Sequence, residues 1–331
     1  MSGTGTGNVI AQAYYFGKVP SRGDFVRSTP GSALIQSIDQ WLSQAMEMLS
    51  EDVRWKITYD TASAIQFAIL GTRSPSGLVG HLMASQDASG RRFPFTTMAS
   101  FDVPQPQAFL ARSPLALSRI WQRMEAAARA AHGATDFASA QEQIAELTME
   151  LTVQAQAFEQ PYRDFKARIT IDRLERLLAA GGDAVSVRQT LLALGMLLQP
   201  VLTQGHAEMS KGLVLPLPQD ALQLPFVLTL WIDLIGRFFK RSDTELGLFV
   251  TQHAGRRLLV LGFHGASPST LRNVLDPDLC LSENVAVSQA QWVEDWIGTD
   301  YGLRKLSNYL RDPELSLAQA VDTFGETFLG D

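Results

Sequence analysis

Hydrophobic positions follow first a strand-like and then a helix-like spacing along the start of the chain. After an opening rich in Gly, Ser and Thr, an apolar run over residues 9–17 predicts a first strand. A stripe at helical spacing follows, made of Leu34, Ile35, Ile38, Trp41, Leu42, Ala45, Met46 and Leu49. The stripe is broad enough to pack a helix against a sheet, and Thr29 is the expected N-cap, with Pro30 at the first helical position.

Three further segments, 64–70, 77–84 and 93–103, have the composition of strands. Turn signals separate them, at residues 74–77 and 87–90. Consecutive strands with short connections predict an antiparallel meander. We therefore expect a flexible N-terminus over residues 1–8, followed by a domain of helix plus antiparallel sheet over residues 9–133.

The rest of the chain, residues 134–331, is expected to be a helix-rich region with a few strands. Helical spacing predicts helices at 113–131, 137–158, 162–179 and 185–201, with breaks at 132–133, 160–161 and 181–182. Beyond them we expect a helix at 221–240, two or three amphipathic helices within 292–328, and strands at 212–217, 246–251 and 257–263. The whole pattern predicts an α+β fold, with an antiparallel or mixed sheet flanked by helices.

Composition excludes several classes of protein. With 46% hydrophobic and 19% charged residues among 331, the chain has the composition of a globular protein. A net charge of -6 without a long basic block argues against binding to nucleic acid. The single cysteine, Cys280, fits a reducing compartment. We see no secretory signal and expect no integral membrane segment, since Asp233 and Arg237 interrupt the longest apolar stretch; the expected location is the cytoplasm.

Motifs for cofactor or metal chemistry are not apparent in the sequence. The five histidines show no HxxxH or HxH spacing, so no metal site is predicted. There is no GxxxxGK[ST] loop and no GxSxG elbow, and the glycines near the N-terminus precede a strand instead of following one. We therefore expect no cofactor.

The most informative segment is a charged bend between the first predicted strand and the first predicted helix. Two aromatic residues, Phe16 and Phe25, bracket a polar cluster made of Lys18, Ser21, Arg22, Asp24 and Arg27. Loops carried on rigid elements are where binding residues concentrate. The cluster is therefore a candidate for partner binding or for organising the loop.

A second polar segment, residues 85–95, adds Asp87, Arg91 and Arg92 to the candidate residues. Asp87 lies in a turn and Gly90 permits a positive φ. In one interpretation this is a plain hairpin with solvated arginines. In the other, Arg91 lies near the charged bend, where Asp24 could pair with it. Such a pair fixes a loop more often than it catalyses a reaction, so partner recognition or loop organisation is favoured over catalysis.

Together these segments resemble the TagF (ImpM) family of type VI secretion system-associated proteins. The resemblance rests on the run YFGKVPSRGDFVR at 15–27, on Asp39 and Trp41-Leu42, and on Asp87 with GRRFPF at 90–95. It covers about the first 110 residues. The resemblance implies a fold with a longin-like N-terminal domain. It also implies a non-enzymatic, cytoplasmic bacterial regulator: a post-translational repressor of secretion, tied to a threonine-phosphorylation pathway, whose partner is the system's forkhead-associated scaffold.

Three other functions stay open at this stage. The chain could be a structural or accessory subunit of the secretion machine, or a longin-like regulator of a small GTPase. It could also be a hydrolase that uses Ser21, Asp24 and Asp87. The regulatory hypothesis predicts that the bend and the hairpin form one preordered docking face.

Overall fold

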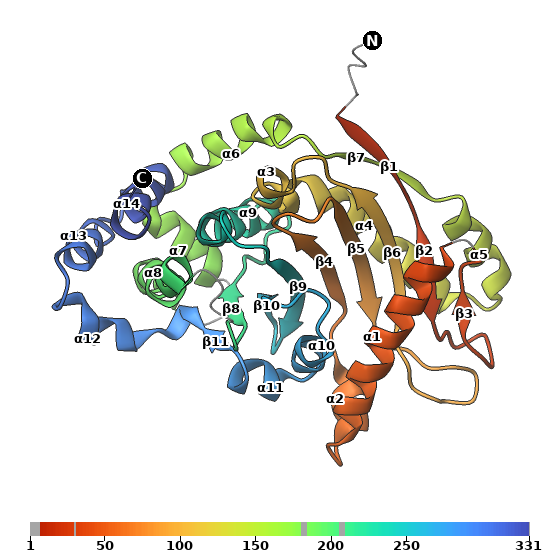
Figure 1. Ribbon diagram of the computed structural model, residues 1–331. Coiled ribbons are helices and arrows are strands. Elements are labelled where there is room, and N and C mark those ends of the chain that lie inside the picture. Colours follow the sequence, from red (N-terminus) through yellow and green to blue (C-terminus); the bar gives the residue numbers. More distant parts are fainter. Residues whose placement is uncertain (1–6, 30, 180–183, 205–208, 331) are drawn as a thin grey trace, which may run out of the picture.

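The protein is organised around one large mixed sheet (Figure 1). A computed structural model of the chain describes residues 7–29, 31–179, 184–204 and 209–330. Within these residues the sheet has nine strands: β2 (Tyr14–Gly17), β3 (Val26–Arg27), β4 (Ile65–Gly71), β5 (Ser76–Met83), β6 (Phe95–Asp102), β8 (Leu213–Pro216), β9 (Glu245–His253), β10 (Arg256–Gly262) and β11 (Val285–Ala286). Their order is β11-β8-β10-β9-β4-β5-β6-β2-β3, and only the β11–β8 pair is parallel.

Both predicted regions of the chain contribute to this sheet. Strand β4 of the N-terminal region pairs with β9 of the C-terminal region, with Gln66 opposite Val250 and Gly71 opposite Glu245. The division near residue 133 stays a prediction, and the two parts share one set of backbone hydrogen bonds. The fold is α+β, as the sequence predicts, and the expected strands at 64–70, 77–84 and 93–103 correspond to β4, β5 and β6.

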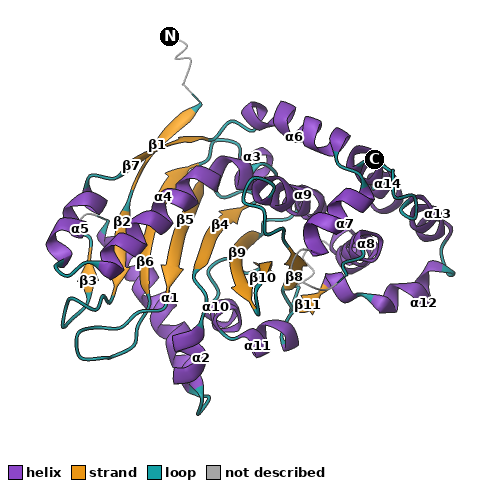
Figure 2. Ribbon diagram, turned by 180° about the vertical axis from the view of Figure 1, so that it is seen from behind, coloured by secondary structure: helices purple, strands orange, loops and turns teal. Residues whose placement is uncertain are grey.

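Helices cover both faces of the sheet (Figures 1 and 2). They are α1 (Ser32–Ser50), α2 (Trp55–Thr61), α3 (Pro106–Leu110), α4 (Ser113–Gly133), α5 (Phe137–Ala145), α6 (Gln156–Arg168), α7 (Ile171–Ala179), α8 (Val187–Gln204), α9 (Leu224–Gly236), α10 (Pro268–Leu275), α11 (Pro277–Ser282), α12 (Glu294–Ile297), α13 (Tyr301–Tyr309) and α14 (Leu317–Phe328). On one face, the predicted stripe of α1 is buried, apart from the half-buried Leu34. In this stripe, Trp41 packs edge-on against Phe67 and at a tilt against Phe249. On the other face lie α4 and α9. None of the helices in the described part of the chain is long and apolar enough to cross a membrane.

Two long predicted elements are wrong because a second, two-stranded ribbon interrupts them. The predicted strand at 9–17 is split into β1 (Asn8–Gln12) and β2, since β1 pairs with β7 (Thr148–Thr152) whereas β2 pairs with β6. The predicted helix at 137–158 is α5, then β7, then the start of α6. In β7, Met149 and Leu151 alternate with exposed residues, which is a strand pattern that neighbouring helical segments obscured.

Other boundaries also differ from the prediction. Helix α1 begins at Ser32 after Gly31, whose φ of 80° turns the chain, so Thr29 is not its N-cap. Pro161 lies inside α6 instead of ending a helix. The predicted helix at 162–179 is interrupted near Thr170, which forms a bridge with Ser316. Pro30, residues 181–182 and residues 1–6 of the predicted flexible terminus lie outside the described residues.

Candidate functional site

The charged bend and the arginine-containing hairpin lie side by side at one end of the sheet (Figures 1 and 2). We call residues 18–27 and 85–95 together the bend–hairpin unit. Several hydrogen bonds join the two segments, among them Ala88 N to Arg22 O at 2.8 Å, Lys18 N to Pro94 O at 3.4 Å, and Ser85 Oγ to Lys18 O at 2.7 Å. The predicted proximity of the two segments is therefore confirmed.

Glycine at the end of β2 permits a close approach to the hairpin. Gly17 ends β2 at a φ of 130°, and a Cβ there would lie 1.9 Å from the carbonyl oxygen of Pro94. Any other residue at this position would force the bend away from the hairpin. In the hairpin, Gly90 has a φ of 77°, which confirms the predicted positive φ.

Asp87 is the buried centre of the bend–hairpin unit. Its residue is 2% exposed, and its carboxylate accepts hydrogen bonds from Lys18 Nζ at 3.0 Å and Arg91 Nε at 2.7 Å. The backbone N–H groups of Ser89 and Arg91 also donate to it, at 2.9 and 3.0 Å. Burial alone would raise the pKa of Asp87, but these donors outweigh it and hold the pKa well below its usual range. The ionised carboxylate therefore ties the bend to the hairpin.

The two arginines of the hairpin have different partners. Besides Asp87, the Arg91 guanidinium donates to the carbonyl oxygen of Gly23 at 2.5 Å, and so holds the tip of the bend. Arg92 instead forms a two-point ion pair with Asp60 of α2, at 2.7 and 2.6 Å. The hydrogen bond from Arg92 lowers the pKa of Asp60.

The predicted Asp24–Arg91 pair is wrong. Asp24 accepts a hydrogen bond from the N–H of Phe25 at 2.8 Å, whereas Arg91 binds Asp87. Asp87 has the advantage because it lies four residues from Arg91 in the same hairpin and its carboxylate is buried, so the ion pair forms within one local turn.

An aromatic cluster supports the exposed side of the unit. The ring of Phe25 stacks on Phe16, with centroids 5.6 Å apart and an interplanar angle of 9°, and meets Phe93 edge-on at 4.9 Å. Lys18 Nζ lies 4.9 Å from the centroid of the Phe25 ring. Phe25 nevertheless remains 43% exposed. It is thus an apolar side chain that is held rigidly and is still accessible.

The remaining predicted residues lie at or near the surface of the unit. Arg22 pairs with Asp136 at 3.2 Å, and both side chains are largely exposed, so the pair contributes little stability. Arg27 is exposed, and its guanidinium has no ion-pair partner among the described residues. The hydroxyl of Ser21 is buried without a hydrogen-bond partner in the described part of the chain. Lys18 and Asp87 therefore organise the unit, and Arg22, Asp24, Arg27 and Arg91 are available at its surface.

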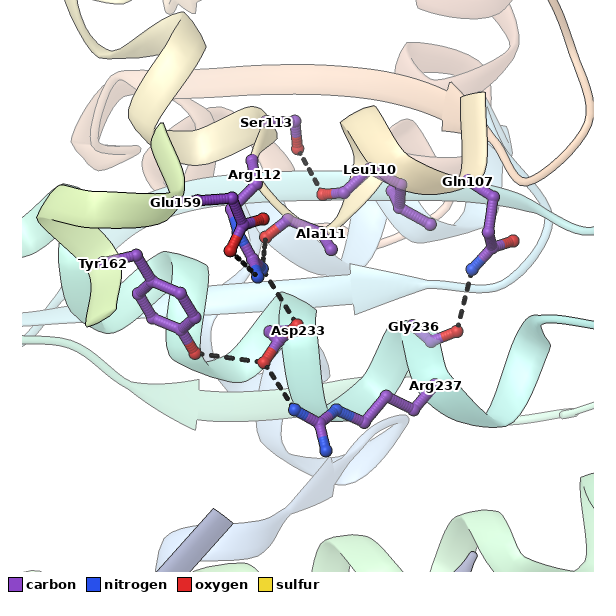
Figure 3. A network of polar contacts seen from close by, with 10 residues as sticks. All are labelled: Gln107, Leu110, Ala111, Arg112, Ser113, Glu159, Tyr162, Asp233, Gly236 and Arg237. Carbon is purple, nitrogen blue, oxygen red and sulfur yellow. Dashed lines mark hydrogen bonds and ion pairs between the residues drawn. The ribbon is translucent and has the colours of Figure 1, made fainter. Parts of the chain in front are cut away.

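A second charged cluster was not predicted (Figure 3). Asp233 of α9 is 6% exposed and accepts hydrogen bonds from Arg112 at 2.9 Å, Tyr162 Oη at 3.2 Å and Arg237 at 3.1 Å. Arg112 also binds both carboxylate oxygens of Glu159, at 2.9 and 3.2 Å. The signal in the sequence was a lone Asp in the apolar stretch that became α9, because a charge in such a stretch needs a partner.

This second cluster has the electrostatics of a structural ion pair. Burial would raise the pKa of Asp233, but the charges of Arg237 and Arg112 outweigh it and lower the pKa. Burial, followed by the charge of Asp233, raises the pKa of Tyr162 well above its ordinary value. Asp233 is therefore ionised and Tyr162 is a neutral donor at neutral pH. The cluster joins the start of α4 to α6 and α9.

Of the comparisons with known proteins, the match to a family model agrees with the resemblance seen in the sequence. Residues 14–147 match the family model described as the TagF N-terminal domain, type VI secretion system-associated. Among solved structures, a similar chain is that of PA0076 from Pseudomonas aeruginosa PAO1, with 23% sequence identity and a TM-score of 0.36. That alignment covers 41% of this chain and 62% of the other, which is less than two thirds of its length. No curated protein matches the sequence.

Proposed function

We propose, from the premise that residues 14–147 form a TagF N-terminal domain of the type VI secretion-associated kind, that this protein is a non-enzymatic cytoplasmic regulator of the secretion system. In this proposal it acts after translation, as a repressor, by binding a protein of that system. The bend–hairpin unit lies within the matched residues and is the proposed docking face.

The observation that carries the proposal is that the unit is both exposed and fixed in shape. Phe25 is 43% exposed and is held between Phe16 and Phe93. The bend behind it is fixed by the buried Lys18–Asp87 ion pair. Aromatic and Arg side chains dominate the binding energy of protein interfaces, and a surface that is already ordered loses less entropy on binding.

Charge indicates the kind of partner surface. The exposed side of the unit carries the guanidinium groups of Arg22, Arg27 and Arg91 against the single carboxylate of Asp24. An acidic patch on the partner would complement it, and such complementarity affects specificity and encounter rate more than affinity. The forkhead-associated scaffold implied by the family resemblance is the proposed partner.

The hydrolase alternative has less support. Its proposed acid or base, Asp87, is buried and already accepts bonds from Lys18 and Arg91. Its other carboxylate, Asp24, is bonded to the N–H of Phe25. The Ser21 hydroxyl has no hydrogen-bond partner among the described residues, so neither carboxylate is placed against it as a general base. A role as an accessory subunit stays an alternative, and a fixed stoichiometry in the assembled machine would favour it.

The docking proposal is tested with surface substitutions that leave the Lys18–Asp87 pair intact. Phe25→Ala and Arg27→Glu are expected to weaken pull-down of the scaffold and to increase release of secreted effectors. The matched controls are Tyr301→Ala and Arg311→Glu, which change exposed residues of the C-terminal helical part. Circular dichroism and thermal unfolding first verify that each variant is folded.

The two sets of variants give opposite expectations. If the folded Phe25 and Arg27 variants bind the scaffold and repress secretion as the unsubstituted protein does, the bend–hairpin unit is not the interface. If the control variants lose both properties equally, the interface lies elsewhere or extends over the C-terminal helices.

A further inference from the structure

A row of polar residues crosses the sheet on the face covered by α4. Neighbouring positions on β9, β4, β5 and β6 form an apolar row, Leu248, Ala68, Val79 and Ala99. The next row on the same face is Val250, Gln66, His81 and Thr97. Period-two alternation assigns such positions to the core, where an apolar row is expected. Three polar side chains in one row therefore call for a physical reason.

Of the three polar side chains in this row, those of Thr97 and Gln66 have hydrogen-bond partners, and that of His81 has none among the described residues. Thr97 Oγ1 donates to the carbonyl oxygen of Met124 at 2.9 Å, and Gln66 Nε2 donates to Glu125 at 3.2 Å. His81 is 2% exposed, and neither of its ring nitrogens has a hydrogen-bond partner among the described residues. Buried polar groups in folded proteins are nearly always hydrogen-bonded.

Burial also fixes the chemical state of His81. Burial is the main cause that lowers the pKa of His81 to about 4. The charge of Glu125 raises this pKa, and the charge of Arg129 lowers it. The imidazole is then neutral at pH 7, with one nitrogen that donates and one that accepts a hydrogen bond. It can therefore bind a group that both accepts and donates, such as a hydroxyl or an amide.

His81 lines a cavity of about 360 Å³ between α4 and the ends of the central strands. The polar side chains around it include Gln66, His81, Glu125, Arg129, Gln252 and Arg257. Arg129 pairs with Glu125 at 2.8 Å, and the Arg129 side chain is 65% exposed. Arg257 comes from the start of β10 and donates through Nη1 to the carbonyl oxygens of Pro218 and Gln219. Two guanidinium groups and one carboxylate thus line the same cavity.

We propose that this cavity binds a small organic anion that also carries a hydroxyl or amide group. Arg257 and Arg129 hold the carboxylate or phosphate, for which the planar guanidinium is the best-suited side chain. His81 and Gln252 bind the hydroxyl or amide group. A metal ion is the weaker candidate, since no group of three His, Cys, Asp or Glu side chains in the described part of the chain could hold one. This inference does not depend on the docking proposal, because the cavity and the bend–hairpin unit have no residue in common.

The test uses the full chain with its histidine rings labelled with ¹⁵N. The probes are two matched pairs, succinate with malate and inorganic phosphate with glycerol 3-phosphate, in which the second member adds a hydroxyl. Glycerol is the uncharged control. We expect at least one hydroxylated anion to shift the His81 signal saturably and to bind more tightly than its matched partner. The pair that responds tells whether the site takes a carboxylate or a phosphate.

Substitutions then locate the binding. His81→Gln, which also assigns the His81 signal, and Arg257→Gln are each expected to weaken binding by about tenfold or more, the effect of losing a hydrogen bond to a charged group. Arg119→Gln, at an exposed position of the same helix α4, is the control and is expected to bind normally. If Arg257→Gln does not fold, Arg129→Gln takes its place.

Three results would overturn the proposal. One is that none of the four anions shifts the His81 signal at millimolar concentration. Another is that binding persists unchanged in His81→Gln and the arginine variant. The last is that glycerol produces the same shift as the anions, which would show that the hydroxyl alone is recognised.

Discussion

Replacing Asp233 by Asn is expected to destabilise the whole protein, because it removes the charge at the centre of a buried network. The Asp233 carboxylate is bound by Arg112, Tyr162 and Arg237 (Figure 3). Asn has nearly the same shape but no negative charge. It therefore leaves the Arg112 guanidinium, whose side chain is only 11% exposed, with Glu159 as its one remaining counter-ion among the described residues.

The size of the effect follows from this burial. Removing one partner of a buried ion pair costs about 3–5 kcal/mol. The remaining Arg112–Glu159 pair, whose Glu side chain is 43% exposed, places the expectation near the lower end of that range. For a chain of this size, each kcal/mol corresponds to about 2 °C in Tm. The expected decrease in Tm is therefore about 6 °C or more.

The assay is urea unfolding at several pH values, with Asp295→Asn at an exposed position as the control. The pKa of Asp233 is lowered in the folded protein, so its charge stabilises the fold above the unfolded pKa of about 4. This contribution is lost as the pH falls through the folded pKa. The stability difference between the unsubstituted protein and Asp233→Asn is thus full at pH 7 and decreases below about pH 4.

A double-mutant cycle separates the ion pair from simple loss of packing. Arg112→Leu and Asp233→Leu are each expected to destabilise strongly, and the double variant by clearly less than the sum, because neither of the two most buried charges is left without its partner. Glu159 and Arg237, which lose their partners in the double variant, are more exposed and can be solvated. Additive effects would refute the reasoning. So would an Asp233→Asn variant that is as stable as the unsubstituted protein at pH 7, or a stability difference that does not change with pH.

Three further predictions concern single buried positions. Gly17→Ala is expected to lower the free energy of unfolding in urea by about 1–3 kcal/mol, because Gly17 has a φ of 130° and an added Cβ would clash with Pro94. The control Gly23→Ala, whose Cβ would meet none of the described atoms within 4 Å, is expected to be nearly neutral. Cys280 is fully buried, and burial raises the pKa of its thiol to about 12. Alkylation by iodoacetamide is therefore expected to be only as fast as unfolding of the protein, and rapid reaction in the folded protein would contradict this. Burial lowers the pKa of His81 to about 4 in the folded protein, so protonation of His81 in the unfolded chain reduces the stability of the fold as the pH falls from about 6.5 to 4. His81→Phe is expected to lose about 2–3 kcal/mol less free energy of unfolding over this pH range. Equal acid sensitivity of the two proteins, measured as ΔG of unfolding against pH, would contradict this.

Local patterns in the sequence were sufficient for the elements around the bend–hairpin unit. The meander of β4, β5 and β6 has short connections, and each strand has its own turn signal. The unit itself could be anticipated because both polar segments adjoin predicted strands, and the structure shows those strands, β2 and β6, paired directly, with Gly17 opposite Phe95. Its ion pairs could not be assigned in this way. Whether Asp24 or Asp87 holds Arg91 depends on which carboxylate is buried, and burial is a property of the folded chain.

Features that depend on distant parts of the chain were beyond the sequence patterns. Strand β1 is completed by β7, with Asn8 opposite Thr152, and a partner so far along the chain leaves no trace in local spacing. Arg112 and Asp233 are 121 positions apart. His81 lies in a strand that was predicted correctly, but that its ring nitrogens have no hydrogen-bond partner in the described part of the chain follows only from the packing of α4 on the sheet.

These long-range contacts bear on how the docking face is held in place. The family match ends at residue 147, yet β4, inside the match, is hydrogen-bonded to β9, and Arg112, also inside it, is neutralised by Glu159 and Asp233. Cutting the chain at 147 would remove the hydrogen bonds of β9 from β4, uncover apolar side chains of the shared core, and remove both carboxylates that bind Arg112. An open strand edge and newly exposed apolar surface are both unfavourable in water. The C-terminal part therefore contributes to the stability of the sheet on which the bend–hairpin unit is mounted, whatever surfaces of its own it offers to a partner.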